Sequence, residues 1–586
     1  MSIGGITYKT INGKRYAYYQ WTENGKQRSR RVKDEEFAEL AAKIAAERAQ
    51  KDSLRGVLQG LVAEPAAAYS AVPNFKTDVK IGVQLPRFFA SVMRWKKREC
   101  FATLHDYIYG ENNDRVLILY GLRRTGKTTL VRQLMGEMPA EMLAKTAFVQ
   151  LSSRHSLADV NHDLKLLESL GYRYVFLDEV TMLSDFIEGA ALFSDVFAAG
   201  GMKVVLSGTD SLGFVFSEDE QLYDRCILLH TTFIPYREFE SVLGIVGIDK
   251  FIEFGGTMSM GGTNYNTDKF TFATKESADD YVDSAIARNI QHSLKCYQHE
   301  GHFRSLQELY DAGELTNAIN RIVEDVNHRF TIEVLTREFK SGDLSRSAQN
   351  LRRDRFRPTD VLDKVDISAV TKRLKHLLQM RDKAELAVGI GEAHRAEIKE
   401  YLDLLDLTCD IDVVNMSNLN ARMSRTVLSQ PGLRYAQASA LIQSLLLDET
   451  FRNVPIAERM TIEKRVIDEI RGRMMEEIVL LETKMARPDK QVFQLQFAVG
   501  EFDMVVFDPK NACCEIYEIK HSDQVAKEQC RHLLDAKKCA DTEFRYGKIL
   551  SKNIIYRGSA GALGDINYLN VEEYLKGLSF TSRSKY

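Results

Sequence analysis

The sequence predicts an α/β protein built from several domains, and three observations lead to this fold class. An apolar run at 116–120 has the composition of a buried strand, and a glycine-rich loop and an amphipathic helix follow it directly. Further strand-like runs at 147–151, 174–179 and 203–208 alternate with helical segments, which is typical of a parallel sheet with helices on both faces. Three more strand-like runs gather near the C-terminus. Because 586 residues are too many for one hydrophobic core, we expect about three to five domains.

Composition excludes several classes of protein. Hydrophobic content of 44% and charged content of 27% are ordinary for a globular chain in water. The net charge of −3 means that any basic surface must be local. We find no run of eighteen apolar residues and no start of a signal peptide, so we expect no membrane contact and a cytoplasmic location. The eight cysteines are scattered without a C-x-x-C pair, which favours neither a zinc site nor a disulfide framework.

Residues 1–50 predict a small basic β meander followed by a helix. The turn signals Asn12-Gly13 and Asn24-Gly25 separate short aromatic runs, and residues 1–33 hold eight Lys or Arg against one acidic residue. A basic sheet with exposed aromatic side chains suits a nucleic-acid backbone, so we expect DNA contact here. A solvated hairpin that docks on the protein itself explains the same pattern. The meander is similar, in general pattern only, to the small arm-binding sheets at the start of some phage integrases. Residues 51–84, rich in Ala, Pro and Ser, predict a linker.

The loop Gly121–Thr129 matches G-x-x-x-x-G-K-[ST], between a strand and a helix as a phosphate-binding loop requires. Its glycines let backbone N–H groups approach phosphates at the helix N-terminus. We expect Lys127 to reach the β- and γ-phosphates of ATP and the Thr128 hydroxyl to hold Mg²⁺. The predicted nucleotide-binding residues are Gly121, Arg124, Thr125, Gly126, Lys127, Thr128 and Thr129.

A second nucleotide motif, four apolar residues followed by Asp178 and Glu179, lies about fifty residues further on. At the carboxyl end of its strand, Asp178 would accept from the Mg²⁺ shell, and Glu179 would polarise the attacking water as general base. An acidic helix cap after a strand is the simpler alternative.

Four segments together resemble the predicted prokaryotic AAA+ ATPases. They are Gly-Leu-Arg-Arg-Thr-Gly-Lys-Thr-Thr-Leu, Phe-Leu-Asp-Glu-Val, Leu-Ser-Gly-Thr-Asp-Ser and Ile-Pro-Tyr-Arg-Glu-Phe. The resemblance implies that Ser207 or Thr209 reads the γ-phosphate. It also puts Arg225 where such proteins have an arginine that acts as a finger on a neighbour's nucleotide, although a structural salt bridge explains Arg225 equally well. The implied arrangement is an ATPase core at 85–250, a helical lid at 251–345, a winged-helix-like region at 346–440 and a restriction-endonuclease-like domain at 441–586. From periodicity alone, the winged-helix-like region is not distinguishable from any helical domain.

Near the C-terminus, strand-like runs at 493–497, 502–507 and 514–520 predict a second chemical site. Glu518 and Lys520 share one strand face, and Asp503 lies on the partner strand of the same hairpin. Two carboxylates and a lysine suit a divalent metal that activates water for phosphodiester cleavage. The pattern resembles the PD-(D/E)XK nucleases, which implies Asp503, Glu518 and Glu476 as metal ligands, with Glu477 as a rival of Glu476, and Lys520 as catalytic lysine. A solvated ion pair, or a nuclease-like fold kept only for binding, explains the same residues.

These features predict an ATP-binding and ATP-hydrolysing protein joined to a nuclease-like domain that contacts DNA. By analogy alone, genome defence or a mobile element fits such an architecture. The rival hypothesis is a nucleotide-controlled switch or scaffold whose nuclease-like domain is inert and binds a protein partner. A homo-oligomer stays open under both hypotheses.

Overall fold

The computed structural model describes residues 5–11, 14–23, 26–32, 73–111, 114–209, 222, 224–231, 233–256, 263–264, 267–268, 275–287, 290–291, 294, 303–341, 366–385, 390–418 and 423–578. The helix expected after the meander, most of the linker at 51–84 and residues 346–365 lie outside these ranges. Within them, no helix is both long and apolar enough to span a membrane.

The N-terminal meander is confirmed as a separate antiparallel sheet. It consists of β1 (Gly5–Ile11), β2 (Lys14–Glu23) and β3 (Lys26–Arg31). The pairs Ile11↔Lys14 and Glu23↔Lys26 leave two residues in each connection, as the two Asn-Gly signals predict.

A six-stranded sheet forms the core of the next domain. Its order is β4-β6-β7-β8-β5-β9, and every pair except β4–β6 is parallel. The strands are β4 (Asp78–Ile81), β5 (Val116–Tyr120), β6 (Thr146–Gln150), β7 (Tyr174–Asp178), β8 (Lys203–Gly208) and β9 (Cys226–His230). The four strands predicted from apolar runs are confirmed. The sequence analysis missed β4 and β9. Strand β4 has only four residues and falls inside the predicted linker.

Helices cover both faces of this sheet, so its strands alternate between two cores. Leu117 and Leu119 of β5 face one core, and Val116 and Ile118 face the other. The helical segments are α2 (Gln84–Phe89), α3 (Phe101–Tyr109), α4 (Lys127–Glu137), α5 (Ala140–Leu143), α6 (Leu157–Ser169), η1 (Val180–Met182), α7 (Phe186–Gly189) and η2 (Phe193–Ala198). This fold brings the carboxyl ends of β5, β7 and β8 to one edge.

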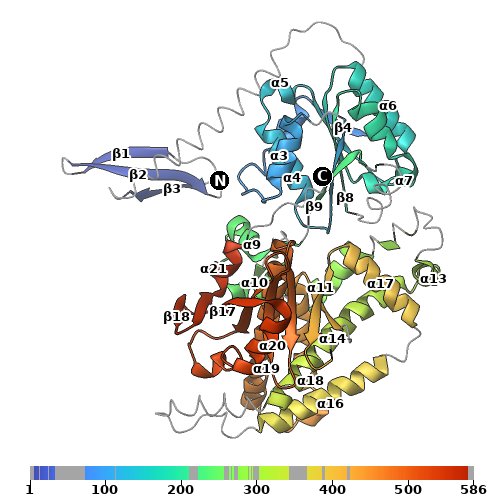
Figure 1. Cartoon of the computed structure of the whole chain (residues 1–586). Coiled ribbons are helices and arrows are strands. Elements are labelled where there is room, and N and C mark those ends of the chain that lie inside the picture. The colour runs from blue at the N-terminus through green and yellow to red at the C-terminus, as the bar shows by residue number, and fades with distance from the viewer. Residues whose placement is uncertain are drawn as a thin grey trace.

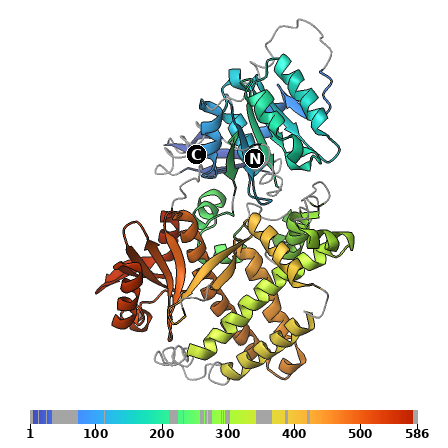
Figure 2. The same ribbon diagram turned by 45° about the vertical axis from the view of Figure 1, so that its right-hand side comes forward.

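Two helices and a helical region follow β9. Helices α9 (Tyr236–Leu243) and α10 (Ile248–Phe254) lie at the top of the lower half of the molecule in Figures 1 and 2, with α9 beside α21 (Val571–Gly577). A short hairpin of β10 (Thr263–Asn264) and β11 (Thr267–Asp268) comes next. The helical region consists of α11 (Lys275–Tyr281), η3 (Val282–Ala287), α13 (Arg304–Asp311), α14 (Leu315–Ser341), α16 (Ile367–Glu385) and α17 (Glu392–Leu404).

An eight-stranded mixed sheet of order β13-β12-β14-β15-β16-β17-β19-β18 forms the C-terminal body. Its strands are β12 (Thr408–Asn415), β13 (Met423–Leu428), β14 (Gln491–Gln496), β15 (Glu501–Asp508), β16 (Cys513–Lys520), β17 (Lys548–Tyr556), β18 (Gly561–Leu563) and β19 (Ile566–Asn570). The other helical segments here are α18 (Pro431–Leu446), η6 (Glu449–Phe451), α19 (Ile456–Ala486), η7 (Lys527–Cys530) and α20 (Ala536–Tyr546). The three strands predicted around Asp503, Glu518 and Lys520 are present as β14, β15 and β16.

The region expected to resemble a winged helix divides between two bodies in the structure. Helix α17 packs in the core of the helical region, whereas β12 pairs in parallel with β14 from Asp412↔Phe493 to Asn415↔Gln496. Strands β12 and β13 therefore extend the C-terminal sheet, and the domain boundary expected at 441 runs through that sheet. Pairing between strands about eighty residues apart leaves no local pattern in the sequence.

Two glycines with left-handed backbone test how tightly the C-terminal sheet is packed. Gly547 has φ of 74°, and a Cβ there would lie 1.7 Å from the Ala512 carbonyl oxygen; Gly564 has φ of 60° and open space around it. We expect Gly564→Ala to lower the free energy of unfolding of this body by about 1 kcal/mol. Gly547→Ala should cost about 2 to 4 kcal/mol, because the added methyl also displaces backbone. Scanning calorimetry of both variants measures the difference, and equal unfolding temperatures would contradict this packing.

Candidate nucleotide and metal sites

The predicted phosphate-binding loop lies between β5 and α4, where two of its glycines are required by geometry. Gly121 has φ of 134°, and a Cβ there would lie 2.4 Å from the Thr231 carbonyl oxygen. Gly126 has φ of 90° and caps α4. Arg124 adopts φ of 64°, which is uncommon for a side chain other than glycine. The loop therefore has a strained conformation that the sequence motif predicts and that side chains elsewhere must hold in place.

The Lys127 side chain lies inside this loop. It is 7% exposed, and its ammonium group donates hydrogen bonds of 2.8 Å to the Gly121 and Leu122 carbonyl oxygens. Burial lowers the pKa of Lys127 to about 8, although the charges of Glu179 and Asp178 act in the opposite direction. A buried ammonium at a helix N-terminus is a suitable partner for phosphate oxygens.

The ends of β7 and β8 and the first turn of α4 meet at Asp178. The Thr128 hydroxyl donates a hydrogen bond of 2.9 Å to Asp178 Oδ2, and the Ser207 hydroxyl donates to Oδ1. Asp178 and Ser207 are direct neighbours on β7 and β8. The hydroxyl of Thr128 and the carboxylate of Asp178 are hard oxygen donors beside a phosphate loop, which is the chemistry that Mg²⁺ prefers, so these residues fit a magnesium ion.

Glu179 directly follows β7 and has a left-handed backbone with φ of 59° and ψ of 43°. Its carboxylate accepts hydrogen bonds of 3.3 and 3.4 Å from the Thr209 hydroxyl. Burial, followed by the charge of Asp178, raises the pKa of Glu179. A carboxylate with raised pKa beside the phosphate loop has the properties of a general base. Ser207 and Thr209, the two candidate sensor residues, thus each contact one acid of the Asp-Glu motif.

The other predicted loop residues have different surroundings. The Thr125 side chain is fully buried and bonds to Leu122 O at 2.8 Å, so it shapes the loop, and Thr129 is half-buried in the first turn of α4. Arg124 lies with its guanidinium carbon 5.5 Å from the centre of the Tyr281 ring on α11. Through Arg124, the loop contacts the helical region.

The structure does not bring Arg225 to the phosphate loop of its own chain. Arg225 precedes β9, and Cys226 pairs with Val116 at the opposite end of β5 from the loop. Its guanidinium forms an ion pair of 2.7 Å with Asp195, and half of the side chain is exposed. Within one chain this arginine makes a structural salt bridge, which was the alternative in the sequence analysis.

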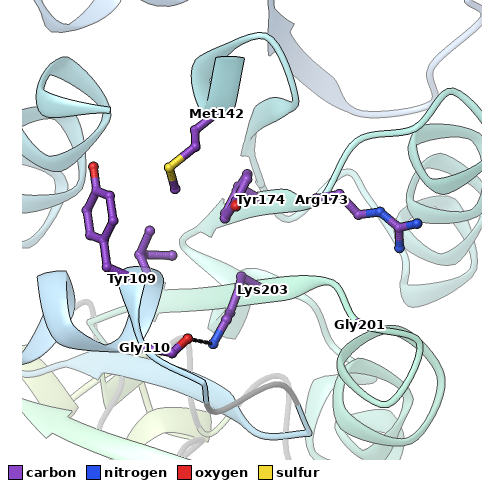
Figure 3. Close-up of a pocket in the computed structure, with 8 residues that line it drawn as sticks. Tyr109, Gly110, Met142, Arg173, Tyr174, Gly201 and Lys203 are labelled. Atoms are coloured by element: carbon purple, nitrogen blue, oxygen red, sulfur yellow. Dashed lines mark hydrogen bonds between the residues drawn. The ribbon is translucent and has the colours of Figure 1, made fainter. Parts of the chain in front are cut away.

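A cavity of about 320 Å³ opens at the same end of the sheet as Arg225, away from the phosphate loop. Figure 3 shows Tyr109, Met142 and Tyr174 around it, with Arg173 extending away from Tyr109 and Met142. The Lys203 ammonium donates a hydrogen bond of 2.9 Å to the Gly110 carbonyl oxygen. The two cationic side chains that line the cavity, Arg173 and Lys203, therefore do not both point into it. The sequence analysis did not predict this cavity.

Asp503, Glu518 and Lys520 lie together, as the strand pattern predicts. The Lys520 ammonium lies 2.9 Å from Asp503 Oδ2 and 2.7 Å from Glu518 Oε2, and both carboxylates are almost fully buried. Burial opposes the charge of Lys520, but the charges of Asp503, Glu518 and Glu476 outweigh it and raise the pKa of Lys520. Burial and the neighbouring Asp503 raise the pKa of Glu518. Lys520 thus remains an ammonium between two carboxyl groups.

The two rival glutamates of α19 point in different directions. Glu477 forms a buried ion pair of 2.5 Å with Arg434 of α18, and burial raises the pKa of Glu477 to about 7. Glu476 pairs with Arg473 on its own helix, and its charge acts on Lys520. Glu476 is therefore the glutamate on the side of the Asp503–Glu518–Lys520 cluster.

These residues fit a divalent metal only in part. Glu518 Oε1 is buried and accepts no hydrogen bond from the described residues, so a proton or a cation could occupy its vicinity. However, across the part of the chain that the structure describes, no group of three or more His, Cys, Asp or Glu side chains is arranged to hold a metal ion. A metal at this cluster would have to compete with the Lys520 ammonium.

The sequence analysis missed Arg98, which donates a hydrogen bond of 2.9 Å to the Thr125 carbonyl oxygen of the phosphate loop. Arg98 ends the run Arg-Trp-Lys-Lys-Arg, which has the composition of a solvated surface segment. Only its burial in the structure, at 7% exposure, distinguishes it from its neighbours.

Comparison with known proteins supports one domain of this chain. A protein-family model described as AAA domain matches residues 113–240, and a domain of unknown function (DUF6788) matches residues 2–42. No curated protein matches. The match and the parallel sheet together identify an AAA-type ATPase domain, which is the coarser part of the resemblance stated above.

Similarity to solved structures adds little to this assignment. C. elegans PCH-2 is 15% identical with a TM-score of 0.19, over 36% of this chain and 61% of that one. The S. cerevisiae Hsp104–ADP complex is 13% identical with a TM-score of 0.20, over 67% of this chain and 48% of that one. The chain thus spans less than two thirds of either relative. These scores are too low to bear on the fold.

The lowered pKa of Lys127 predicts how nucleotide affinity depends on pH. Only the charged ammonium attracts phosphate, and its pKa in the free protein is about 8. We expect the affinity for ATP to fall by roughly eightfold between about pH 7.5 and about pH 9, as the ammonium loses its proton. Fluorescence titration with labelled ATP measures this. Lys127→Arg, which stays charged over this range, should bind with a nearly flat profile. A flat profile for the wild-type protein would contradict the burial of Lys127.

Proposed function

We propose that the chain binds ATP with Mg²⁺, hydrolyses it in the AAA-type domain, and uses the nucleotide state to control a nuclease-like C-terminal domain that contacts DNA. The observation that carries this proposal is the contact from Thr128 to Asp178, with Lys127 inside the loop. At one edge of the sheet, the Lys127 ammonium can attract phosphate oxygens, and the Thr128 and Asp178 oxygens can bind Mg²⁺.

The proposed chemistry uses the chain's own residues at each step. Lys127 attracts the β- and γ-phosphate oxygens, and the glycines let backbone N–H groups approach them. Thr128 and Asp178 would hold magnesium, which neutralises phosphate charge when bound with ATP. Glu179 accepts a proton from water as the water oxygen attacks the γ-phosphorus, and the bond to the β-phosphate oxygen breaks with its electron pair leaving on ADP. The hydrogen bond from Thr209 orients the Glu179 carboxylate for this step.

Two substitutions separate binding from hydrolysis. We expect Lys127→Ala to weaken ATP binding by at least about tenfold, because it removes the buried cation. Glu179→Gln should bind ATP with an affinity within a few-fold of wild type, because the Gln side chain has the same shape as Glu. Its turnover should fall by about a hundredfold or more, because the amide cannot accept a proton from water. Isothermal titration and phosphate release measure the two effects. Unchanged ATP affinity in Lys127→Ala, or normal turnover in Glu179→Gln, would refute the assignment.

The C-terminal cluster favours two functions, and a specific observation supports each. Asp503, Glu518 and Lys520 lie together and the charge of Glu476 acts on Lys520, and these are the residue types that a metal-dependent nuclease uses. The alternative is a nucleotide-controlled switch or scaffold in which this cluster is inert and the domain binds a protein partner. It is supported by the ammonium of Lys520, which already forms ion pairs with both carboxyl groups. Roles in genome defence or in a mobile element rest on analogy alone.

Plasmid cleavage with Mg²⁺ or Mn²⁺ discriminates between the two. If the cluster is catalytic, wild-type protein should nick plasmid and Asp503→Asn should lose at least about a hundredfold of that activity, because one metal ligand loses its charge. Asp489→Asn is a matched control, since Asp489 is exposed on the turn before β14. Cleavage that is equal in wild type and Asp503→Asn would indicate contamination, and no cleavage by either would favour the switch.

A further inference from the structure

Arg98 links the phosphate loop to α9 by a buried fork of hydrogen bonds. One guanidinium nitrogen donates to the Thr125 carbonyl oxygen at 2.9 Å, and two others donate to Glu238 Oε2 at 2.9 and 2.6 Å. The second oxygen of Glu238 accepts from the Glu99 backbone N–H at 2.6 Å. Arg98 and Glu238 are 7% and 3% exposed, so water does not compete for these bonds.

The hydrogen bond to Thr125 O constrains the loop itself. In a planar trans peptide, the carbonyl oxygen and the next N–H point in opposite directions. Because Arg98 holds the Thr125 carbonyl oxygen, the Gly126 N–H points away from Arg98. Gly126 directly precedes Lys127, so the orientation of this peptide decides where a phosphate-binding N–H lies.

Helix α9, which carries Glu238, packs in the hydrophobic core of the C-terminal body and not in the two cores beside the six-stranded sheet. Tyr236 and Phe239 of α9 are buried in the same hydrophobic cluster as α18 and α19. The Tyr236 N–H donates a hydrogen bond of 2.7 Å to the buried Glu482 carboxyl group of α19. Helix α19 also carries Glu476, six residues away and therefore about 9 Å along the same helix.

Helix α10 makes a second contact with the candidate metal site. Asp249 accepts a hydrogen bond of 2.8 Å from His521 and pairs with Arg557 at 3.0 Å. His521 directly follows Lys520, and Arg557 directly follows β17. Helix α9 thus contacts α19, which carries Glu476, and α10 contacts the residues that directly follow β16 and β17. The third element of the cluster, β15, carries Asp503. Figure 1 shows both helices at the end of the C-terminal body that faces the ATPase sheet.

We infer that Arg98 is a positioning residue for the phosphate loop and that, through Glu238, it couples the nucleotide state to the C-terminal cluster by way of α9 and α10. This inference rests on the proposed function and names the regulation of that same site. ATP binding changes the orientation of the Thr125 peptide and so moves the Arg98–Glu238 pair. Because the pair is buried in a packed core, its movement shifts helix α9.

The first test asks whether Arg98 and Glu238 act as one unit on ATP binding. Lys cannot replace the planar fork, so Arg98→Lys should weaken ATP binding about tenfold or more, and Glu238→Gln should do so less strongly. The double variant should be no weaker than Arg98→Lys alone. The control is Glu99→Gln. The Glu99 side chain is half exposed and pairs with Arg237 of α9 at 2.5 Å, and among the described residues it forms no hydrogen bond to the phosphate loop. It should bind within twofold of wild type. Wild-type affinity in Arg98→Lys, or losses that multiply in the double variant, would overturn the inference.

The second test asks whether nucleotide reaches the C-terminal body. Hydrogen exchange of the full chain is compared with and without ATP and Mg²⁺, with nucleotide raised to saturate each variant. We expect ATP to slow exchange in peptides covering 471–486 and 513–521 of wild type, and to have less than about half that effect in Arg98→Lys. A full response in Arg98→Lys would overturn the coupling. ATP binding without any response in wild type would overturn the coupling and leave the nucleotide site standing, whereas failure of wild type to bind ATP would overturn both.

Discussion

The hydrogen bond between Thr128 and Asp178 is the contact on which the rest of this molecule depends. It joins the first turn of α4 to the end of β7, and the Ser207 hydroxyl of β8 completes it from the other side. Parallel pairing of β5, β7 and β8 puts their carboxyl ends at one edge, where the glycines let the backbone turn back over Lys127. The geometry of the candidate nucleotide site is thus a consequence of strand order.

The C-terminal cluster obeys a different electrostatic rule. Its two carboxyl groups are buried and would repel each other, and the partly exposed Lys520 ammonium stabilises them. The same arrangement can serve a nuclease, in which a metal displaces part of this interaction, or a rigid binding module that never needs one. The position of α9 and α10, between the phosphate loop and this cluster, gives either use a route for control by nucleotide.

Much of the site could be predicted from the sequence because its signals are local. The strand before Gly121, the glycines of the loop and the two acids at the end of β7 each follow from a few consecutive residues. The Asp503, Glu518 and Lys520 pattern follows from two neighbouring strands of one hairpin. Long-range pairing could not be predicted. Strand β12 joins the C-terminal sheet through β14, Arg98 is indistinguishable in sequence from its surface neighbours, and the choice between Glu476 and Glu477 depends on the partner of each side chain, Arg434 in the case of Glu477. Such facts depend on tertiary packing, which neither propensity nor periodicity records.

The most direct test of the central claim is the effect of Mg²⁺ on ATP affinity, measured by titration with and without a chelator in wild type and in Asp178→Asn. If Thr128 and Asp178 hold magnesium beside the triphosphate, Mg²⁺ should tighten ATP binding of the wild type by about tenfold or more and should have little effect on Asp178→Asn. An equal gain in both proteins would show that Asp178 takes no part in holding the metal, and the account of this edge of the sheet would be wrong.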